Sequence, residues 1–204
     1  MSSTAYRLSF TSGGLLTREA AVAAPLYLCL GDWAEVRSTV DEENALQTRT
    51  VASGKRLSRE LVQRLAELSD EEVSVISDAT ATERAQLMWV AACRRYDLIG
   101  EFAEEMVRER FLLMTPTLGP ADFDSFIRAK ALWHEELAEL ADSTLRKLRT
   151  NLFLMLREAG ILTDAGQIMP VVLSTPIAGL LTARTPSDIR FFPARDSSLV
   201  DAQP

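Results

Sequence analysis

The chain has 204 residues, 47% of them hydrophobic and 25% charged, and its formal net charge is -7 at pH 7. This balance excludes a disordered chain and is typical of a globular protein with one or two small domains. The acidic charge argues against indiscriminate binding of nucleic acid, so any such contact has to be local. Two isolated cysteines, Cys29 and Cys93, form no disulfide framework, and we expect buried thiols in a reducing cytoplasm.

Neither a signal peptide nor a membrane span is expected. The first ten residues lack a basic start followed by an unbroken apolar run. The most apolar runs, 26–30 and 111–114, are far shorter than the roughly 20 residues that cross a bilayer. The sequence therefore predicts a soluble, cytoplasmic protein that makes no contact with a membrane.

Apolar residues recur at helical spacing through the first half of the chain. Three capping signatures mark helix starts, because an Asp, Ser or Thr is followed by Glu three residues later: Asp32 with Glu35, Ser69 with Glu72, and Thr80 with Glu83. The expected helices cover 20–30, a segment from residue 32, 53–68, 69–76 and 80–114, with a kink or break at Gly100. We predict an N-terminal helical bundle over residues 1–115.

The segment TPTLGP at 115–120 has two prolines and a glycine in six residues, which is typical of a linker. Three helices are expected after it, over roughly 120–133, 134–141 and 143–160, and then two short β-prone runs separated by the turn 164–166. Three helices and a small hairpin are the element order of a winged helix, whose third helix enters the DNA major groove.

We therefore predict an all-α fold class with two domains. The first is the N-terminal helical bundle over 1–115. The second is a winged-helix-like three-helix unit with a small β-hairpin over 120–195. Residues 196–204 are expected to form a flexible tail.

The third helix of the second domain is basic although the protein is acidic. Residues 143–162 carry four cations against the single acid Glu158. Leucine and methionine side chains cluster on one face, which leaves the cations on or near the opposite face. Guanidinium groups suit phosphates and guanine edges because their planar donor fork is always charged. The predicted nucleic-acid contacts of this helix are Arg146, Lys147, Arg149, Thr150 and Arg157.

An alternative for this helix is a solvated face whose cations are balanced by acids of the preceding helix, Glu135, Glu136 and Glu139. A second basic cluster covers residues 49–64, with five cations and one acid. Its alternative is a flexible charged loop. If both clusters lay on one face, they would form a track for the phosphates of duplex DNA. The predicted phosphate contacts of the second cluster are Lys55, Arg56 and Arg59.

No catalytic signature is present. His134 is the only histidine, which argues against a zinc site and a Ser-His-Asp triad. SGKRLS contains the glycine-lysine pair of a phosphate-binding loop, but arginines occupy its first glycine and hydroxyl positions. We predict a non-enzymatic protein without cofactor or metal. Three tryptophans lie among apolar neighbours and are interpreted as core anchors rather than base-stacking platforms: Trp33, Trp89 and Trp133.

YRLSFTSGGLLTREAAVAAPLYL at 6–28 resembles the start of BrxA proteins, small components of bacterial BREX (bacteriophage exclusion) defence systems. The resemblance continues through GDWAEVR and DEENALQTRT, RLSRELVQRLAELSDEE, ATATERAQLMWVAACRRY and the helical segment 131–162. It implies an all-helical cytoplasmic protein encoded beside a DNA methyltransferase, an ATPase and other BREX proteins. It also implies likeness to the RNA-binding antitermination factor NusB and to DNA binders. An older label for the family suggests an inner-membrane protein. This sequence does not support that label, because it contains no apolar segment long enough to span a membrane.

The leading prediction is a non-enzymatic BREX accessory protein that binds double-stranded DNA through both basic clusters with weak sequence selectivity. An alternative is a protein-interaction scaffold, in which the acidic surface and an outward Phe153 and Leu154 dock another BREX protein. A third is RNA binding in the antitermination style.

Overall fold

The computed structural model describes residues 5–10 and 14–194 of the chain. Over these ranges the protein is built from helices, with two isolated β-bridges and no longer strand. The chain divides into two units, one from Leu15 to Arg95 and the other from the residues up to Gly14 together with those from Tyr96 onward. The tail expected over 196–204 lies outside the described residues.

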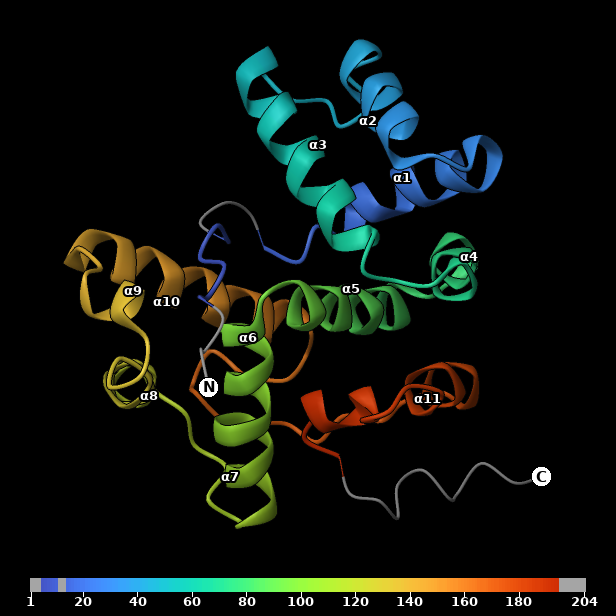
Figure 1. Ribbon diagram of the computed structural model, residues 1–204. Coiled ribbons are helices and arrows are strands. Elements are labelled where there is room, and N and C mark those ends of the chain that lie inside the picture. The colour runs from blue at the N-terminus through green and yellow to red at the C-terminus, as the bar shows by residue number, and fades with distance from the viewer. Residues whose placement is uncertain (1–4, 11–13, 195–204) are drawn as a thin grey trace. The chain divides into compact units, whose positions relative to one another are not determined.

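The unit Leu15–Arg95 contains five helices: α1 (Thr17–Leu30), α2 (Trp33–Glu42), α3 (Val51–Leu65), α4 (Asp70–Asp78) and α5 (Ala81–Arg95) (Figure 1). All three predicted N-caps are confirmed. Asp32 accepts hydrogen bonds from the first backbone N–H groups of α2. Ser69 and Glu72 form a reciprocal capping box, as do Thr80 and Glu83, so these helices begin where short polar side chains satisfy free backbone donors.

Helix α5 is the centre of this unit, because every residue from Ala85 to Cys93 is buried. A helix that is buried all round has to lie among other helices. Two buried ion pairs lie within the same unit. The two Nη atoms of Arg94 donate hydrogen bonds of 2.6 Å to the two carboxylate oxygens of Glu72. The fully buried Arg64 donates a hydrogen bond of 2.7 Å to the carboxylate of Glu60.

The second unit contains α6 (Asp97–Phe102), the π-helix η1 (Ala103–Arg108), α7 (Glu109–Leu112), α8 (Pro120–Lys130), α9 (Glu135–Ala138), α10 (Asp142–Glu158), α11 (Thr175–Thr182) and the 3-10 helix η2 (Asp188–Phe191). Figure 1 shows α6, η1 and α7 as one continuous helix. The chain breaks at Tyr96, which has extended backbone angles, rather than at Gly100, which lies inside α6.

Aromatic side chains fill the core of this second unit. Phe102 lies within 5.8 Å of Phe123 and 5.2 Å of Phe126, measured between ring centroids. Phe153 of α10 belongs to the same cluster at 6.4 Å from Phe102, and it is buried. The predicted outward position of Phe153 is therefore wrong, because α6 and α10 pack together and cover that side of α10.

The interpretation of the tryptophans and cysteines holds only in part. Trp89 is fully buried in α5, and Trp33 stacks on Tyr27 with ring centroids 3.9 Å apart. Trp133 is 80% exposed, so its interpretation as a core anchor is wrong. Helix α8 ends at Lys130, and the following turn carries this side chain away from the buried stripe. Cys93 is buried as expected, whereas Cys29 is exposed.

The expected linker is bound to the turn that follows α10. The backbone N–H of Leu118 donates to Gly166 at 2.8 Å, and that of Ile168 donates to Pro116 at 2.7 Å. Gly166 has φ +77, and a Cβ there would stand 2.7 Å from the carbonyl oxygen of Leu118, so this approach requires glycine. The two antiparallel bridges, Thr117 with Gln167 and Leu162 with Ile168, flank the turn expected at 164–166.

The boundary between the two units therefore lies between Arg95 and Tyr96, and not at the linker 115–120 that the composition indicates. We expected segments over 1–115 and 120–195, but the structure groups everything from Tyr96 onward with the helices after the linker. The physical reason is side-chain contact across the linker: Arg110 of α7 forms a 2.6 Å ion pair with Asp122 of α8, and Lys130 of α8 contacts Glu105 of η1 at 2.7 Å.

Candidate nucleic-acid interface

Helix α10 presents one buried and one exposed side. Its inward stripe, predicted from helical spacing, is confirmed by four buried side chains: Leu148, Leu152, Met155 and Leu156. This stripe leaves Arg146, Lys147 and Thr150 exposed. The sequence therefore located the side of α10 that faces water and the cations on its first turns.

The two cations at the start of α10 have no carboxylate partner within the described residues. Arg146 is exposed, and its Nε donates to the backbone carbonyl of Asp142 at 3.3 Å. Lys147 is exposed and has no ion pair within the described part of the chain. The Thr150 hydroxyl donates to the carbonyl of Arg146 at 2.8 Å, which leaves its oxygen able to accept a bond but its proton already used.

Two other predicted contacts have carboxylate partners. Nη1 of Arg149 lies 2.8 and 2.7 Å from the two carboxylate oxygens of Asp124 on α8. Nε of Arg157 lies 3.5 Å from Asp164, whose side chain is almost fully exposed. A phosphate would have to displace a strong, half-buried partner at Arg149 and a weak one at Arg157.

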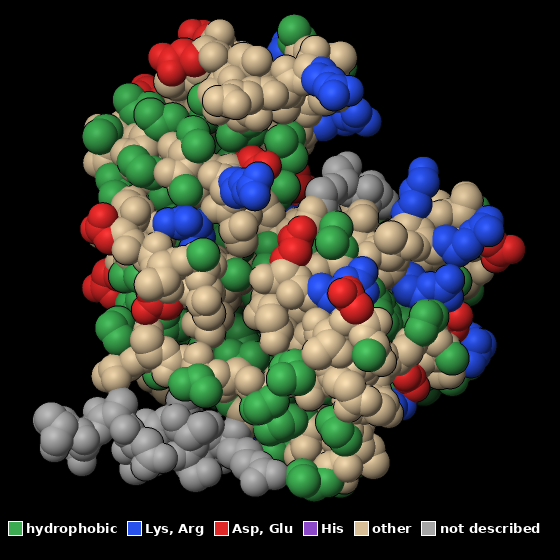
Figure 2. All heavy atoms as spheres, turned by 180° about the vertical axis from the view of Figure 1, so that it is seen from behind, with side chains coloured by type: hydrophobic (Ala, Val, Ile, Leu, Met, Phe, Trp, Pro, Cys, Tyr) green, Lys and Arg blue, Asp and Glu red, His purple; other side chains and the backbone are tan. Residues whose placement is uncertain are grey.

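The helices α8 and α10 line an open surface hollow of about 380 Å³, which we call the cationic hollow. Three arginines and two aspartates surround it, and two aliphatic side chains complete it. Figure 2 shows Lys and Arg side chains gathered over this part of the molecule, at the right of the view. The lining residues are Asp124, Ile127, Arg128, Asp142, Leu145, Arg146 and Arg149.

Sequence reasoning missed Arg128 as a member of this cluster. Arg128 is exposed in the last turn of α8, and it donates to the hydroxyl of Ser125 at 2.8 Å. The sequence offers little reason to select Arg128. Single cations are common near the C-terminal end of a helix, because they interact favourably with the helix dipole there. Only the packing of α8 on α10 brings Arg128 to the same hollow as Arg146 and Arg149.

The second basic cluster lies on α3 in the other unit. Lys55, Arg56 and Arg59 are all exposed within the helix, which begins at Val51. Arg64, counted with this cluster in the sequence, is fully buried beside Glu60 and offers nothing to a partner. Three exposed cations therefore remain on the predicted phosphate-binding helix.

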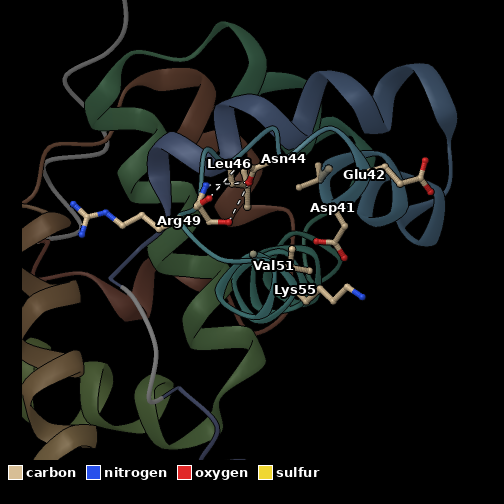
Figure 3. A pocket seen from close by; sticks show the side chains of 10 residues that line it. Asp41, Glu42, Asn44, Leu46, Arg49, Val51 and Lys55 are labelled. Atoms are coloured by element: carbon tan, nitrogen blue, oxygen red, sulfur yellow. Dashed lines mark hydrogen bonds between the residues drawn. The ribbon is translucent and has the colours of Figure 1, made fainter.

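A pocket of about 280 Å³ lies where α2, the loop after it and α3 meet (Figure 3). Asp41 and Glu42 line it together with Lys55, so opposite charges offset each other there. In Figure 3 the side chain of Arg49 points away from the pocket, and the dashed lines join Asn44 to Thr48. The loop is held by its own hydrogen bonds, and the pocket does not form a cradle for an anion.

The described residues contain no group of three or more His, Cys, Asp or Glu side chains placed to hold a metal ion. Among the helices of that same portion, none combines the length and apolarity that a membrane crossing requires.

A sequence profile described as BrxA matches residues 4–185. The chain belongs to the BrxA family. Its relatives include the BREX protein BrxA of Paramagnetospirillum magneticum (strain ATCC 700264 / AMB-1), 26% identical over 160 residues, which are 78% of this chain and 80% of that protein. The BREX protein BrxA of Escherichia coli O9:H4 (strain HS) is 28% identical over 148 residues, 72% of this chain and 70% of that protein.

A solved structure supports the helical fold of this BrxA-family chain. It is the crystal structure of an uncharacterized protein from Magnetospirillum magneticum, with a TM-score of 0.81 and 23% sequence identity. The match covers 93% of this chain and 100% of the other. At this identity the likeness establishes the fold, and the cationic hollow has to be argued from its own geometry.

Proposed function

We propose that this BrxA-family protein is a non-enzymatic accessory component of a BREX phage-defence system that acts in the cytoplasm by binding double-stranded DNA. Two relatives carry the name BREX protein BrxA, which supports the system. The observation that carries DNA binding is the pair of exposed cations, Arg146 and Lys147, at the start of α10 beside the cationic hollow.

In this proposal α10 lies in or along the major groove of DNA. Its 17 residues correspond to a rod about 25 Å long, and the major groove is about 12 Å wide, enough to admit a helix. Helices α8, α9 and α10 followed by the bridged turn at 164–166 have the element order of a winged helix, with the turn beside the DNA backbone.

The contacts would be mostly with phosphates. Arg146 and Lys147 would bind first, because neither has a carboxylate partner within the described residues. Arg149 would join after exchanging Asp124 for a phosphate, and Thr150 and Arg157 would lie farther along the helix. Since phosphate contacts carry no sequence information directly, sequence selectivity would be weak. On α3, Lys55, Arg56 and Arg59 would add phosphate contacts.

Charge reversal at the start of α10 tests this proposal. Arg146→Glu/Lys147→Glu should weaken binding to a fluorescent 30-base-pair duplex by tenfold or more at about 50 mM salt, measured by anisotropy. Each phosphate contact that is lost should also flatten the slope of log affinity against log salt by about 0.9. The matched control Arg7→Glu/Arg184→Glu reverses two other exposed arginines and should bind nearly as the parent does.

Retained affinity in the α10 variant, with its helical circular dichroism unchanged, would show that DNA does not bind there. Competition with structured RNA of equal length separates duplex DNA from RNA as the preferred ligand. A helix cannot enter the narrow major groove of A-form RNA, so DNA should compete better if α10 lies in the groove.

A further inference from the structure

An exposed apolar pair stands at the turn between α8 and α9. Leu132 is 77% exposed and Trp133 is 80% exposed. A large apolar side chain left in water stabilises nothing in the free protein, whereas tryptophan is the residue type most enriched at the energetic centre of protein interfaces. We call Leu132 and Trp133 the apolar tip.

The apolar tip is held in place on both sides. Before it, Lys130 forms ion pairs with Glu101 at 2.5 Å and Glu105 at 2.7 Å. After it, His134 stacks on Tyr6 with ring centroids 4.1 Å apart. The backbone N–H of Trp133 also donates to the carbonyl of Lys130 at 3.0 Å. A turn fixed in this way loses little conformational freedom when it docks, so more of its burial energy remains as affinity.

The charges beside the tip are acidic. Glu135 of α9 and Glu139 directly after it are exposed. Glu136 of α9 is partly exposed and accepts a 2.7 Å hydrogen bond from the backbone N–H of Tyr6. The single cation of the turn, Lys130, is already bound to two glutamates. Phosphates would be repelled here, and a surface with an apolar centre and a cationic rim would be complementary.

The same unit carries such a surface. The cationic hollow has Ile127 and Leu145 in its lining, with three arginines, Arg128, Arg146 and Arg149, against two aspartates, Asp124 and Asp142. Asp124 is bound to Arg149, so the excess positive charge lies mainly on Arg128 and Arg146. Arg128 lies in the last turn of α8, and Leu132 follows in the turn after the helix ends at Lys130. One copy therefore carries both an apolar tip and a cationic hollow, and a two-fold dimer can pair each tip with the hollow of the other copy.

We propose that this chain self-associates as a symmetric dimer in which the apolar tip of each copy enters the cationic hollow of the other. The indole of Trp133 would cover Leu145, and the glutamates of α9 would face the arginine rim. A buried aromatic side chain removes about 150–250 Å² from water, so two such contacts with their rims give a small interface of the kind that transient complexes use. The inference does not rest on DNA binding, although both use the same hollow.

Sedimentation velocity without nucleic acid, at 1–100 µM protein and about 50 mM salt, tests the dimer. The parent should shift from monomer toward dimer over this range, and 500 mM salt should move it back because the rim contacts are charged. Trp133→Ala should lower the association constant at least tenfold. The matched control Leu113→Ala truncates another side chain that is 73% exposed, and it should associate as the parent does.

Reversing the charge of one arginine in the cationic hollow gives a second, independent measurement. Arg128→Glu should abolish self-association as Trp133→Ala does, and the double variant Arg128→Glu/Glu135→Arg should recover part of it. A parent that remains monomeric at 100 µM, or a dimer unaffected by Trp133→Ala, would overturn the proposal. Either result leaves the DNA titration of Arg146 and Lys147 unaffected, so the two proposals can fail separately.

Discussion

Asp124 should restrain the DNA affinity of this protein, and its removal should strengthen binding. The Asp124 carboxylate holds Nη1 of Arg149 at 2.7 and 2.8 Å, inside the cationic hollow. A phosphate that binds Arg149 has to replace this carboxylate and to approach its negative charge. Asp124→Asn keeps the size of the side chain and removes the charge, so the competition ends while the packing of α8 on α10 is kept.

The size of the effect follows from the exposure of the pair. Arg149 and Asp124 are 27% and 31% exposed, so water screens part of their attraction. Ion pairs of this kind are worth about 0.2–1 kcal/mol in double-mutant cycles. If Asp124→Asn improves the free energy of DNA binding by the upper value, about 1 kcal/mol, the complex is roughly fivefold tighter. An improvement by the lower value, about 0.2 kcal/mol, is barely measurable. The slope against salt should steepen by up to about 0.9 if Arg149 gains a full phosphate contact.

The assay is the anisotropy titration of a 30-base-pair duplex at several salt concentrations, with the parent, Asp124→Asn and a matched control. Glu109→Gln removes one negative charge from an exposed position on α7 and reports the effect of net charge alone. If both variants bind equally tightly and with the same slope against salt, Asp124 does not restrain binding through Arg149, and the expected competition is refuted. Weaker binding of Asp124→Asn than of the parent would mean that the carboxylate orients Arg149 for DNA instead of competing with it.

Three further outcomes concern stability and are measured by urea unfolding of the purified chain. Trp89→Ala should cost about 3–5 kcal/mol, because the side chain is fully buried in the centre of α5. Glu72→Gln should cost about 3 kcal/mol, because it leaves the guanidinium of Arg94 buried without its bidentate acid, and a loss below 1 kcal/mol would contradict a strong pair. Hydrogen bonding from the backbone N–H of Tyr6 lowers the pKa of Glu136 below its ordinary 4.5, so its contribution is complete above pH 4.5 and disappears as pH falls through the lowered pKa. Glu136→Gln should therefore be less stable than the parent at pH 7, and the difference should shrink as the pH falls below 4.5.

Local features of the fold could be predicted because they depend on a few neighbouring residues. The caps at Asp32, Ser69 and Thr80 need only a short polar side chain and nearby backbone donors. The inward stripe of α10 through Leu148 and Leu152 follows from helical periodicity alone. These predictions located the helix starts and the exposed cations of the candidate site.

Features that depend on distant residues were not predictable from the same patterns. Phe153 falls on the outer side of an isolated helix, but Phe102 lies against it in the folded unit. Arg64 was counted among the five cations of the second basic cluster, although its spacing to Glu60 already allowed the i, i+4 pair that forms. Trp133 was assigned to the core because its neighbours in sequence are apolar, and the end of α8 could not be placed closely enough to show otherwise.

The hydrogen bonds between residues 116–118 and the turn at 166–168 bear on how this chain responds to proteases and truncation. A cut at Thr115 or Pro116 would leave a short end tethered by backbone bonds, and the fragments on either side of the cut should copurify until denaturant is added. A shortened chain that stops after α10 would expose the unpaired carbonyl of Pro116 and remove the acceptor for Leu118. Expression of the α8–α10 region alone should therefore succeed only when both the preceding peptide and the following turn are kept.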